Sequence, residues 1–109
     1  MAGGFVGILS VDLHLPEAGS LKAKRRELQR VKQGLARRFA CAVSEVDHHD
    51  LWQRAGVTLV VVHREAGQAE HAVESASRWL HGDPSFVVVG EERRLVAADD
   101  PDMALGETV

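Results

Sequence analysis

The run Val57–Val62, with the sequence VTLVVV, restricts the fold of this chain more than any other stretch. It is almost wholly β-branched, and β-branched side chains favour strands over helices. Its apolar residues fall on both faces of the expected strand, which is typical of a strand inside a sheet. We therefore predict a strand here, in a central position.

Three further strands are predicted around it. Phe5–Leu15 alternates between two faces, with Val6, Ile8, Ser10, Asp12 and His14 together on one of them. Pro16 to Gly19 then break the strand. Ala40–Val46 is the second strand in chain order, and Phe86–Val89, continuing toward Val96, is the fourth.

Two helices separate these strands. Ser20 is a natural N-cap for a helix that runs to about Phe39. Its apolar side recurs at helical spacing and consists of Leu21, Leu28, Val31, Leu35 and Phe39. The second helix is predicted over Gln68–His81, where Gly82, Asp83 and Pro84 end it.

The resulting order is strand, helix, strand, strand, helix, strand, which predicts an α+β, ferredoxin-like βαββαβ fold. Right-handed crossovers place both helices on one face of a four-stranded antiparallel sheet, with the second and fourth strands at its edges. We expect residues 1–96 to form this single domain, and the acidic tail, residues 97–109, to be disordered. In this topology the end of the first strand, the start of the first helix and the segment Ser44–Arg54 share one rim of the domain. We call this segment the hinge.

Composition limits the class of protein. The 109 residues suit one domain, and no apolar run approaches the roughly 20 residues that span a bilayer. The start of the chain lacks the features of a secretory signal, and Cys41 is the one cysteine, so no internal disulfide can form. We expect a cytoplasmic protein without membrane contact.

The charges are distributed unevenly. Residues 20–39 hold eight of the thirteen Lys and Arg residues and a single acid, Glu27, so this segment carries +7 in a chain of net charge −3. The candidate anion-binding or nucleic-acid-binding residues are Lys22, Lys24, Arg25, Arg26, Arg30 and Arg37. Four cations lie in the first two turns, where the positive end of the helix dipole disfavours them.

Three interpretations of these cations stay open. Internal acids, for which Glu17, Asp47 and Asp50 are the candidates, would pair with them at the shared rim. Alternatively, they bind an external phosphate, or they form a solvated surface. Lys24 and Arg25 also flank the apolar side of the helix. The aliphatic parts of their side chains could therefore cover the edge of the core.

The hinge carries the other candidate site residues, which are Asp47, His48, Asp50, Trp52, Gln53 and Arg54. Adjacent Asp and His residues rarely present their donors to one ion, and no second cluster at a metal-ligand spacing accompanies them, so no metal or cofactor is predicted. No catalytic motif is visible and no catalytic residue is assigned. Trp52 is interpreted as an anchor of the loop in the core, with a stacking platform for a nucleobase as the alternative.

Two motifs in these segments resemble the YlxP-like family of small bacterial proteins, a domain of unknown function. Ser20-Leu-Lys-Ala-Lys-Arg25 is similar to the family pattern Ser-Leu-Lys-x-Lys-Arg, and Glu45 to Gln53 is similar to Glu-Val-Asp-His-x-Asp-Leu-Trp-Gln. The resemblance extends over roughly Gly4–Val96. It implies a ferredoxin-like fold in a cytosolic bacterial protein whose relatives are often encoded beside translation and ribosome-maturation factors.

The favoured hypothesis is a non-enzymatic module that binds structured RNA or a ribosomal component through the basic helix. The alternative is a homodimer or other protein-interaction module without a nucleic-acid role. It would use the sheet face left open by the helices, where Val6, Ile8, Val60 and Val62 are expected to lie. An enzyme acting on a small phosphorylated substrate is the third, less favoured hypothesis.

Overall fold

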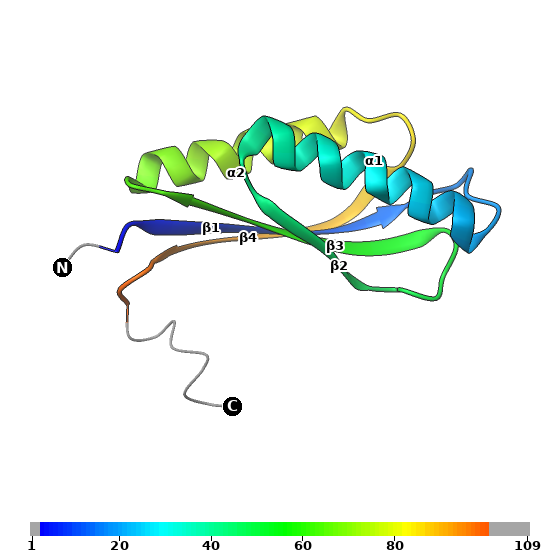
Figure 1. Ribbon diagram of the computed structural model, residues 1–109, viewed down its shortest axis with the longest axis horizontal. Helices are drawn as coiled ribbons and strands as arrows, with labels where there is room; N and C mark the ends of the chain where they lie inside the picture. Colours follow the sequence, from blue (N-terminus) through cyan, green and yellow to red (C-terminus); the bar gives the residue numbers. More distant parts are fainter. Residues whose placement is uncertain (1–2, 101–109) are drawn as a thin grey trace.

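The computed structural model describes residues 3–100 of the chain and shows six elements (Figure 1). They are β1 (Phe5–His14), α1 (Leu21–Phe39), β2 (Ala42–Asp47), β3 (Arg54–His63), α2 (Ala66–His81) and β4 (Val87–Ala97). This is the predicted βαββαβ order, and the predicted ferredoxin-like fold is confirmed.

The four strands form one antiparallel sheet in the order β2-β3-β1-β4. β1 and β3 are central, and β2 and β4 are the edge strands, as predicted. Both helices cover the same face of the sheet and leave the other face open (Figure 1). Val6 pairs with Val62 and Ile8 with Val60 across the central strands, so these four side chains share the open face.

The start and end of α1 follow from local chemistry. The Ser20 side-chain oxygen accepts a hydrogen bond of 3.0 Å from the backbone N–H of Ala23, which confirms the predicted N-cap. The helix ends at Phe39, and the C-cap residue Ala40, whose backbone is left-handed (φ 49°), donates its N–H to the carbonyl of Ala36. Because both ends are capped, the helix holds its first and last turns in fixed positions.

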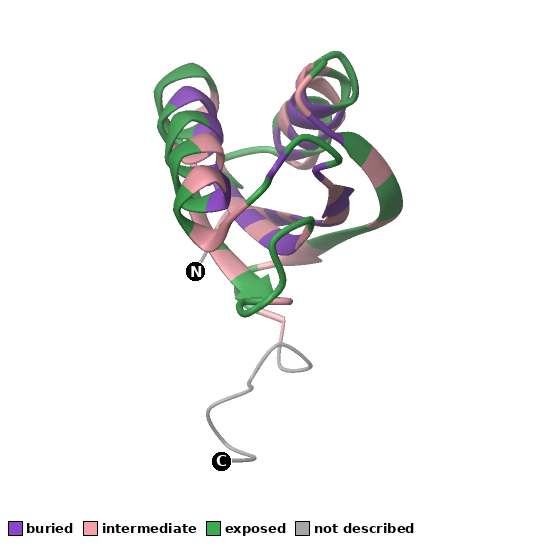
Figure 2. Ribbon diagram, turned by 90° about the vertical axis from the view of Figure 1, so that its right-hand side faces the viewer, coloured by how far each residue is buried: buried purple, intermediate pink, exposed green. Residues whose placement is uncertain are grey.

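The core lies between the helices and the sheet, and Figure 2 shows the buried residues on the inward sides of both helices. Leu28, Val31 and Leu35 of α1 are at most 3% exposed. Trp79 of α2 packs against Gly34 of α1, where an added Cβ would lie 2.8 Å from the indole ring. Glycine at this position therefore lets the two helices approach each other.

The observed boundaries differ from the predicted ones mainly at the hinge. β3 begins at Arg54, three residues before the predicted start, because Arg54 already pairs with His14 of β1. β4 is one strand whose register shifts opposite Asp12 and Leu13, consistent with a β-bulge. It runs to Ala97, which is the first residue of the predicted tail, and residues 101–109 of that tail lie outside the described residues.

Neither α1 nor α2 is long and apolar enough to cross a membrane, and residues 3–100 contain no other helix that is.

Candidate functional site

The hinge and the first turns of α1 meet at one corner of the domain, as predicted. The Nζ atom of Lys24 lies 2.9 Å from the carbonyl oxygen of His48. Two segments that are more than twenty residues apart in sequence are thus in direct contact. This corner, bounded by the end of β1, the start of α1 and the hinge, is the first part of the candidate site.

Lys24 is the centre of this corner and is only 1% exposed. Its ammonium group donates to Glu45 Oε2 at 3.0 Å and to the carbonyl oxygens of His48, His49 and Arg54 at 2.9, 3.1 and 3.3 Å. The prediction that Lys24 binds an external anion is therefore corrected, because the ammonium group is enclosed by internal acceptors. Its acidic partner is Glu45, rather than one of the three acids that the sequence suggested.

Several hinge residues hold the loop in shape. The Asp47 carboxylate accepts a hydrogen bond of 2.8 Å from the backbone N–H of His48, whose φ of 58° is left-handed. Gln53 donates from its side chain to the Pro16 carbonyl at 3.1 Å, and its own carbonyl accepts from Leu15 at 2.8 Å. The two Gln53 contacts fix the hinge to the loop between β1 and α1, and the Asp47 contact shapes the turn within the hinge, so both residues have a structural role.

The tip of the hinge, in contrast, points into solvent. Trp52 is 54% exposed and its neighbour Leu51 is 51% exposed. The interpretation of Trp52 as an anchor in the core is wrong, because Lys24 and Gln53 tether the loop instead. Asp50 is exposed as well. The indole of Trp52 is therefore available at the corner where α1 begins.

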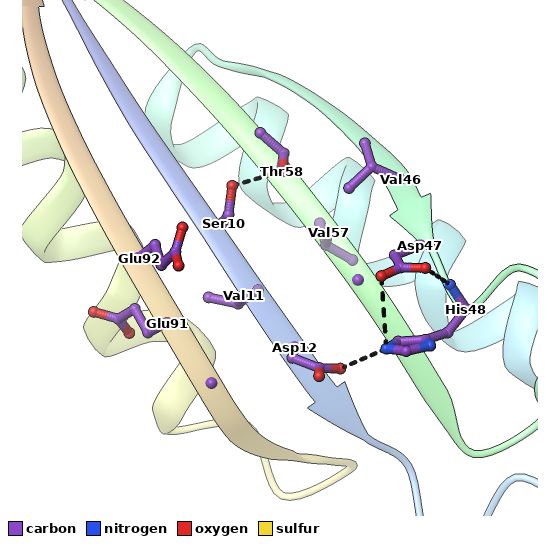
Figure 3. Close-up of a pocket in the computed structure, with 12 residues that line it drawn as sticks. Ser10, Val11, Asp12, Val46, Asp47, His48, Val57, Thr58, Glu91 and Glu92 are labelled. Carbon is purple, nitrogen blue, oxygen red and sulfur yellow. Dashed lines mark hydrogen bonds and ion pairs between the residues drawn. The ribbon is translucent and has the colours of Figure 1, made fainter.

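A second feature lies beside this corner, on the open face of the sheet (Figure 3). It is a hollow of about 340 Å³, which we call the open-face hollow. Asp12 faces a glycine on both neighbouring strands, Gly56 of β3 and Gly90 of β4. Because neither glycine carries a side chain, the sheet surface is depressed around Asp12.

Polar side chains surround the open-face hollow. The imidazole Nε2 of His48 lies 3.6 Å from Asp12 Oδ1 and 3.9 Å from Asp47 Oδ2 (Figure 3). Arg54 donates to the other oxygen of Asp12. Glu92, on β4, lies on the opposite side of β1 from Asp47 and His48 (Figure 3). Around the hollow, the carboxylates of Asp12, Asp47 and Glu92 outnumber the guanidinium of Arg54, and the fourth carboxylate of the lining, Glu91, is paired with His81 and Arg93. The hollow therefore has a negative character, which disfavours phosphate.

Sequence reasoning placed Asp12 at the shared rim but did not assign it, Glu92 or the two glycines to a site. The signal that could have found them is the pairing register, which sets Asp12 between Gly56 and Gly90. Ser10 and Thr58 also line the hollow and share a hydrogen bond of 2.8 Å. Within residues 3–100, no group of three or more His, Cys, Asp or Glu side chains is arranged to hold a metal ion.

The third feature is the basic surface of α1. Within residues 3–100, six cations of this helix form no ion pair, and we call them the free cations of α1. They are Lys22, Arg25, Arg26, Lys32, Arg37 and Arg38. Five of the six are exposed, and Lys32 is half-buried.

Arg30 differs from the free cations of α1. Its guanidinium lies 2.9 Å from Glu27 and 2.8 Å from Asp83, so its charge is balanced inside the protein. Burial disfavours the charged form of Asp83, but hydrogen bonds from Arg30 and from Ser85 outweigh it and hold the pKa of Asp83 below its ordinary value. These two acids compete with an external anion for the Arg30 guanidinium, and the assignment of Arg30 to an anion-binding surface stays a prediction.

Comparisons with known proteins agree with the two motifs read from the sequence. A family model described as "Protein of unknown function (DUF503)" matches residues 6–93. The "Uncharacterized protein YlxP" of Bacillus subtilis (strain 168) is 27% identical over 81 residues, which cover 74% of this chain and 88% of that protein.

Among solved structures, the "De novo designed protein Foldit4" superposes with a TM-score of 0.52 at 16% identity, covering 85% of this chain and 97% of the designed one. At that identity the likeness concerns the fold alone. The family match, in contrast, extends over most of the chain and includes both motifs that meet at Lys24. The chain therefore belongs to the DUF503 family of proteins of unknown function.

Proposed function

We propose that this protein is a cytoplasmic, non-enzymatic module that binds structured RNA, free or within the ribosome, through the exposed side of α1. The observation that carries the proposal is the set of free cations of α1, which have no acidic partner in residues 3–100. The only acid of the helix, Glu27, is bound to Arg30.

The arrangement of these cations suits a phosphate backbone. Lys22, Arg26 and Arg37 lie on the side of α1 opposite its buried residues, with Gln29 and Gln33 between them. From Lys22 to Arg37 the helix rises about 22 Å, at 1.5 Å for each residue. Lys22 and Arg26 are one turn apart near the positive end of the helix dipole, so an external anion would relieve their mutual repulsion.

The carboxylates around the open-face hollow are opposite in sign to the free cations of α1. The open-face hollow carries Asp12, Asp47 and Glu92, which repel phosphate. RNA would therefore approach from the helical side. The exposed Trp52 lies in the hinge, which Lys24 joins to the start of α1, and its indole would stack on an unpaired base beside the phosphates.

The proposal is tested by fluorescence anisotropy with a labelled RNA hairpin at several salt concentrations. The logarithm of the affinity should fall linearly with the logarithm of salt concentration. The double variant Lys22→Glu/Arg26→Glu should weaken binding at low salt and reduce the slope by roughly two, about one for each lost phosphate contact. The control is Arg64→Glu/Arg78→Glu, which makes the same charge change on exposed residues outside α1. Salt-independent binding, or equal losses in both variants, would rule out α1 as the RNA surface.

A second candidate function rests on the apolar part of the open face. Val62 is 65% exposed and lies beside Val6 and Val60 on this face, with no helix covering them. We propose as the alternative that a second copy of the chain packs there to form a homodimer. Sedimentation equilibrium should then show a dimer that Val62→Lys dissociates, whereas Val87→Lys, at the far end of β4, leaves it intact. A wild-type protein that stays monomeric at high concentration would exclude this alternative.

A further inference from the structure

A hollow of about 650 Å³ lies between the end of α1, the end of β3 and the first half of α2. It is separate from the Lys24 corner and from the open-face hollow, and it adjoins the basic surface of α1 through Arg38. The polar side chains that line it are Arg38, His63, Gln68, His71 and Ser75, and its apolar wall includes Phe39. We call it the helix-end hollow.

The polar groups of the helix-end hollow are available to a ligand. Arg38, His63, Gln68 and His71 form no side-chain hydrogen bond with any residue between 3 and 100. No Asp or Glu lines the hollow. The guanidinium of Arg38 lies 5.7 Å from the centre of the Trp79 ring, a cation–π contact that orients it without neutralising its charge. The hollow therefore favours an anionic group.

The rest of the wall suits a flat apolar group of a ligand. Phe39, Ala40 and Ala72 contribute apolar surface, and Gly67 leaves open space where a side chain would project. The volume lies within the roughly 300–1,000 Å³ typical of small-ligand sites. Each group suits one part of a nucleotide. The aromatic wall can contact a base, the oriented guanidinium can bind a phosphate, and the free amide of Gln68 can bond to the polar edge of the base.

We propose that the helix-end hollow binds a nucleoside monophosphate unit. Arg38 holds its phosphate, the wall at Phe39 contacts its base, and Gln68 bonds to the edge of the base. The unit is either a free nucleotide or an unpaired nucleotide at the end of an RNA. In the second case the inference rests on the proposed function, because the hollow lies at the end of α1 next to Arg37.

Titration of the full ¹⁵N-labelled chain with each of AMP, GMP, CMP and UMP tests the site without any RNA. At least one nucleotide should shift the amide signals of Phe39, His63 and His71 saturably. Arg38→Gln should weaken this binding about tenfold, the effect of losing one hydrogen bond to a charged group. Arg64→Gln makes the same change on an exposed neighbour of His63 that does not line the hollow, and it should leave the affinity within about twofold.

Gly67→Leu is the second variant, because its side chain enters open space and adds helix propensity, so the protein should still fold. It should abolish the shifts while circular dichroism stays unchanged. The proposal is overturned if no nucleotide gives saturable shifts up to about 10 mM. It is also overturned if inorganic phosphate binds as tightly as the best nucleotide, or if the folded Gly67→Leu protein binds normally.

A final comparison separates the two sources of the ligand. An RNA hairpin with one unpaired 3′ nucleotide and its blunt counterpart are each bound to wild type and to Gly67→Leu. Tighter wild-type binding of the overhang, lost in Gly67→Leu, assigns the site to RNA. Equal binding of both hairpins, with nucleotide shifts retained, assigns it to free nucleotides. If α1 does not bind RNA at all, the mononucleotide titration still decides the inference, so the two failures are distinguishable.

Discussion

Replacement of Lys24 by Met should cost this domain a large part of its stability. The side chain is 1% exposed, and the Glu45 side chain that it meets is 11% exposed. Met keeps most of the apolar stem, so the change removes mainly the ammonium group and its contacts with Glu45 and three carbonyl oxygens. Breaking a buried ion pair by removing one partner costs about 3–5 kcal/mol.

Urea denaturation measures this loss directly. Lys24→Met should lower the free energy of unfolding by about 4 kcal/mol and the melting temperature by on the order of 20 °C. Lys22 is an exposed lysine of the same helix, so Lys22→Met is the matched control. It should change the free energy of unfolding by less than about 0.5 kcal/mol.

The double variant Lys24→Met/Glu45→Leu should recover at least about 2 kcal/mol relative to Lys24→Met, because it no longer leaves a carboxylate buried without its partner. The reasoning is refuted if Lys24→Met loses less than about 1 kcal/mol. It is equally refuted if the double variant is no more stable than the single one.

Three other predictions concern the helices and the single cysteine. The lowered pKa of Asp83 contributes stability above its ordinary value of about 3.9, and this stability is lost as the pH falls through the lower folded value. Acid unfolding followed by circular dichroism should therefore begin at higher pH in Arg30→Gln than in wild type, and an unchanged midpoint would contradict the ion pair. Burial raises the pKa of the Cys41 thiol, so alkylation by iodoacetamide near pH 8 should be slower than for a free cysteine and should still accelerate above pH 9. An alkylation rate that levels off below pH 9 would contradict the raised pKa of Cys41. Gly34→Val should destabilise the domain by about 1–3 kcal/mol in urea, because its side chain would collide with Trp79, and Gly19→Val, in open space, is the control.

The fold was predictable because each strand and helix repeats its own apolar pattern. The pattern of Val57–Val62 predicted that β3 is a strand in the centre of the sheet, and Ser20 predicted the start of α1. The shared rim followed from topology alone. Burial of Lys24 was not predictable in the same way, although it flanks the apolar side of α1. Its acceptors are supplied by Glu45 and by hinge carbonyls that only the folded chain brings together.

The candidate site was predicted less well for the same reason. The local sequence around Trp52 indicates an apolar residue in a polar loop, but whether it is buried depends on which other contacts hold the loop. Here Gln53 and Lys24 do so, and Trp52 stays exposed. The open-face hollow depends on the register that sets Gly56 and Gly90 beside Asp12, and register is a property of paired strands rather than of one segment.

The most direct test of the proposed function is to map the RNA-binding face by NMR on the full ¹⁵N-labelled chain. With a structured RNA hairpin at low salt, the perturbed signals should be the amides of Lys22, Arg26 and Arg37 and the indole N–H of Trp52. The amides of Ser10, Asp12 and Glu92 on the open face should not change. Perturbations confined to the open face, or none at RNA concentrations that saturate other basic modules, would contradict the assignment of α1 as the RNA-binding surface.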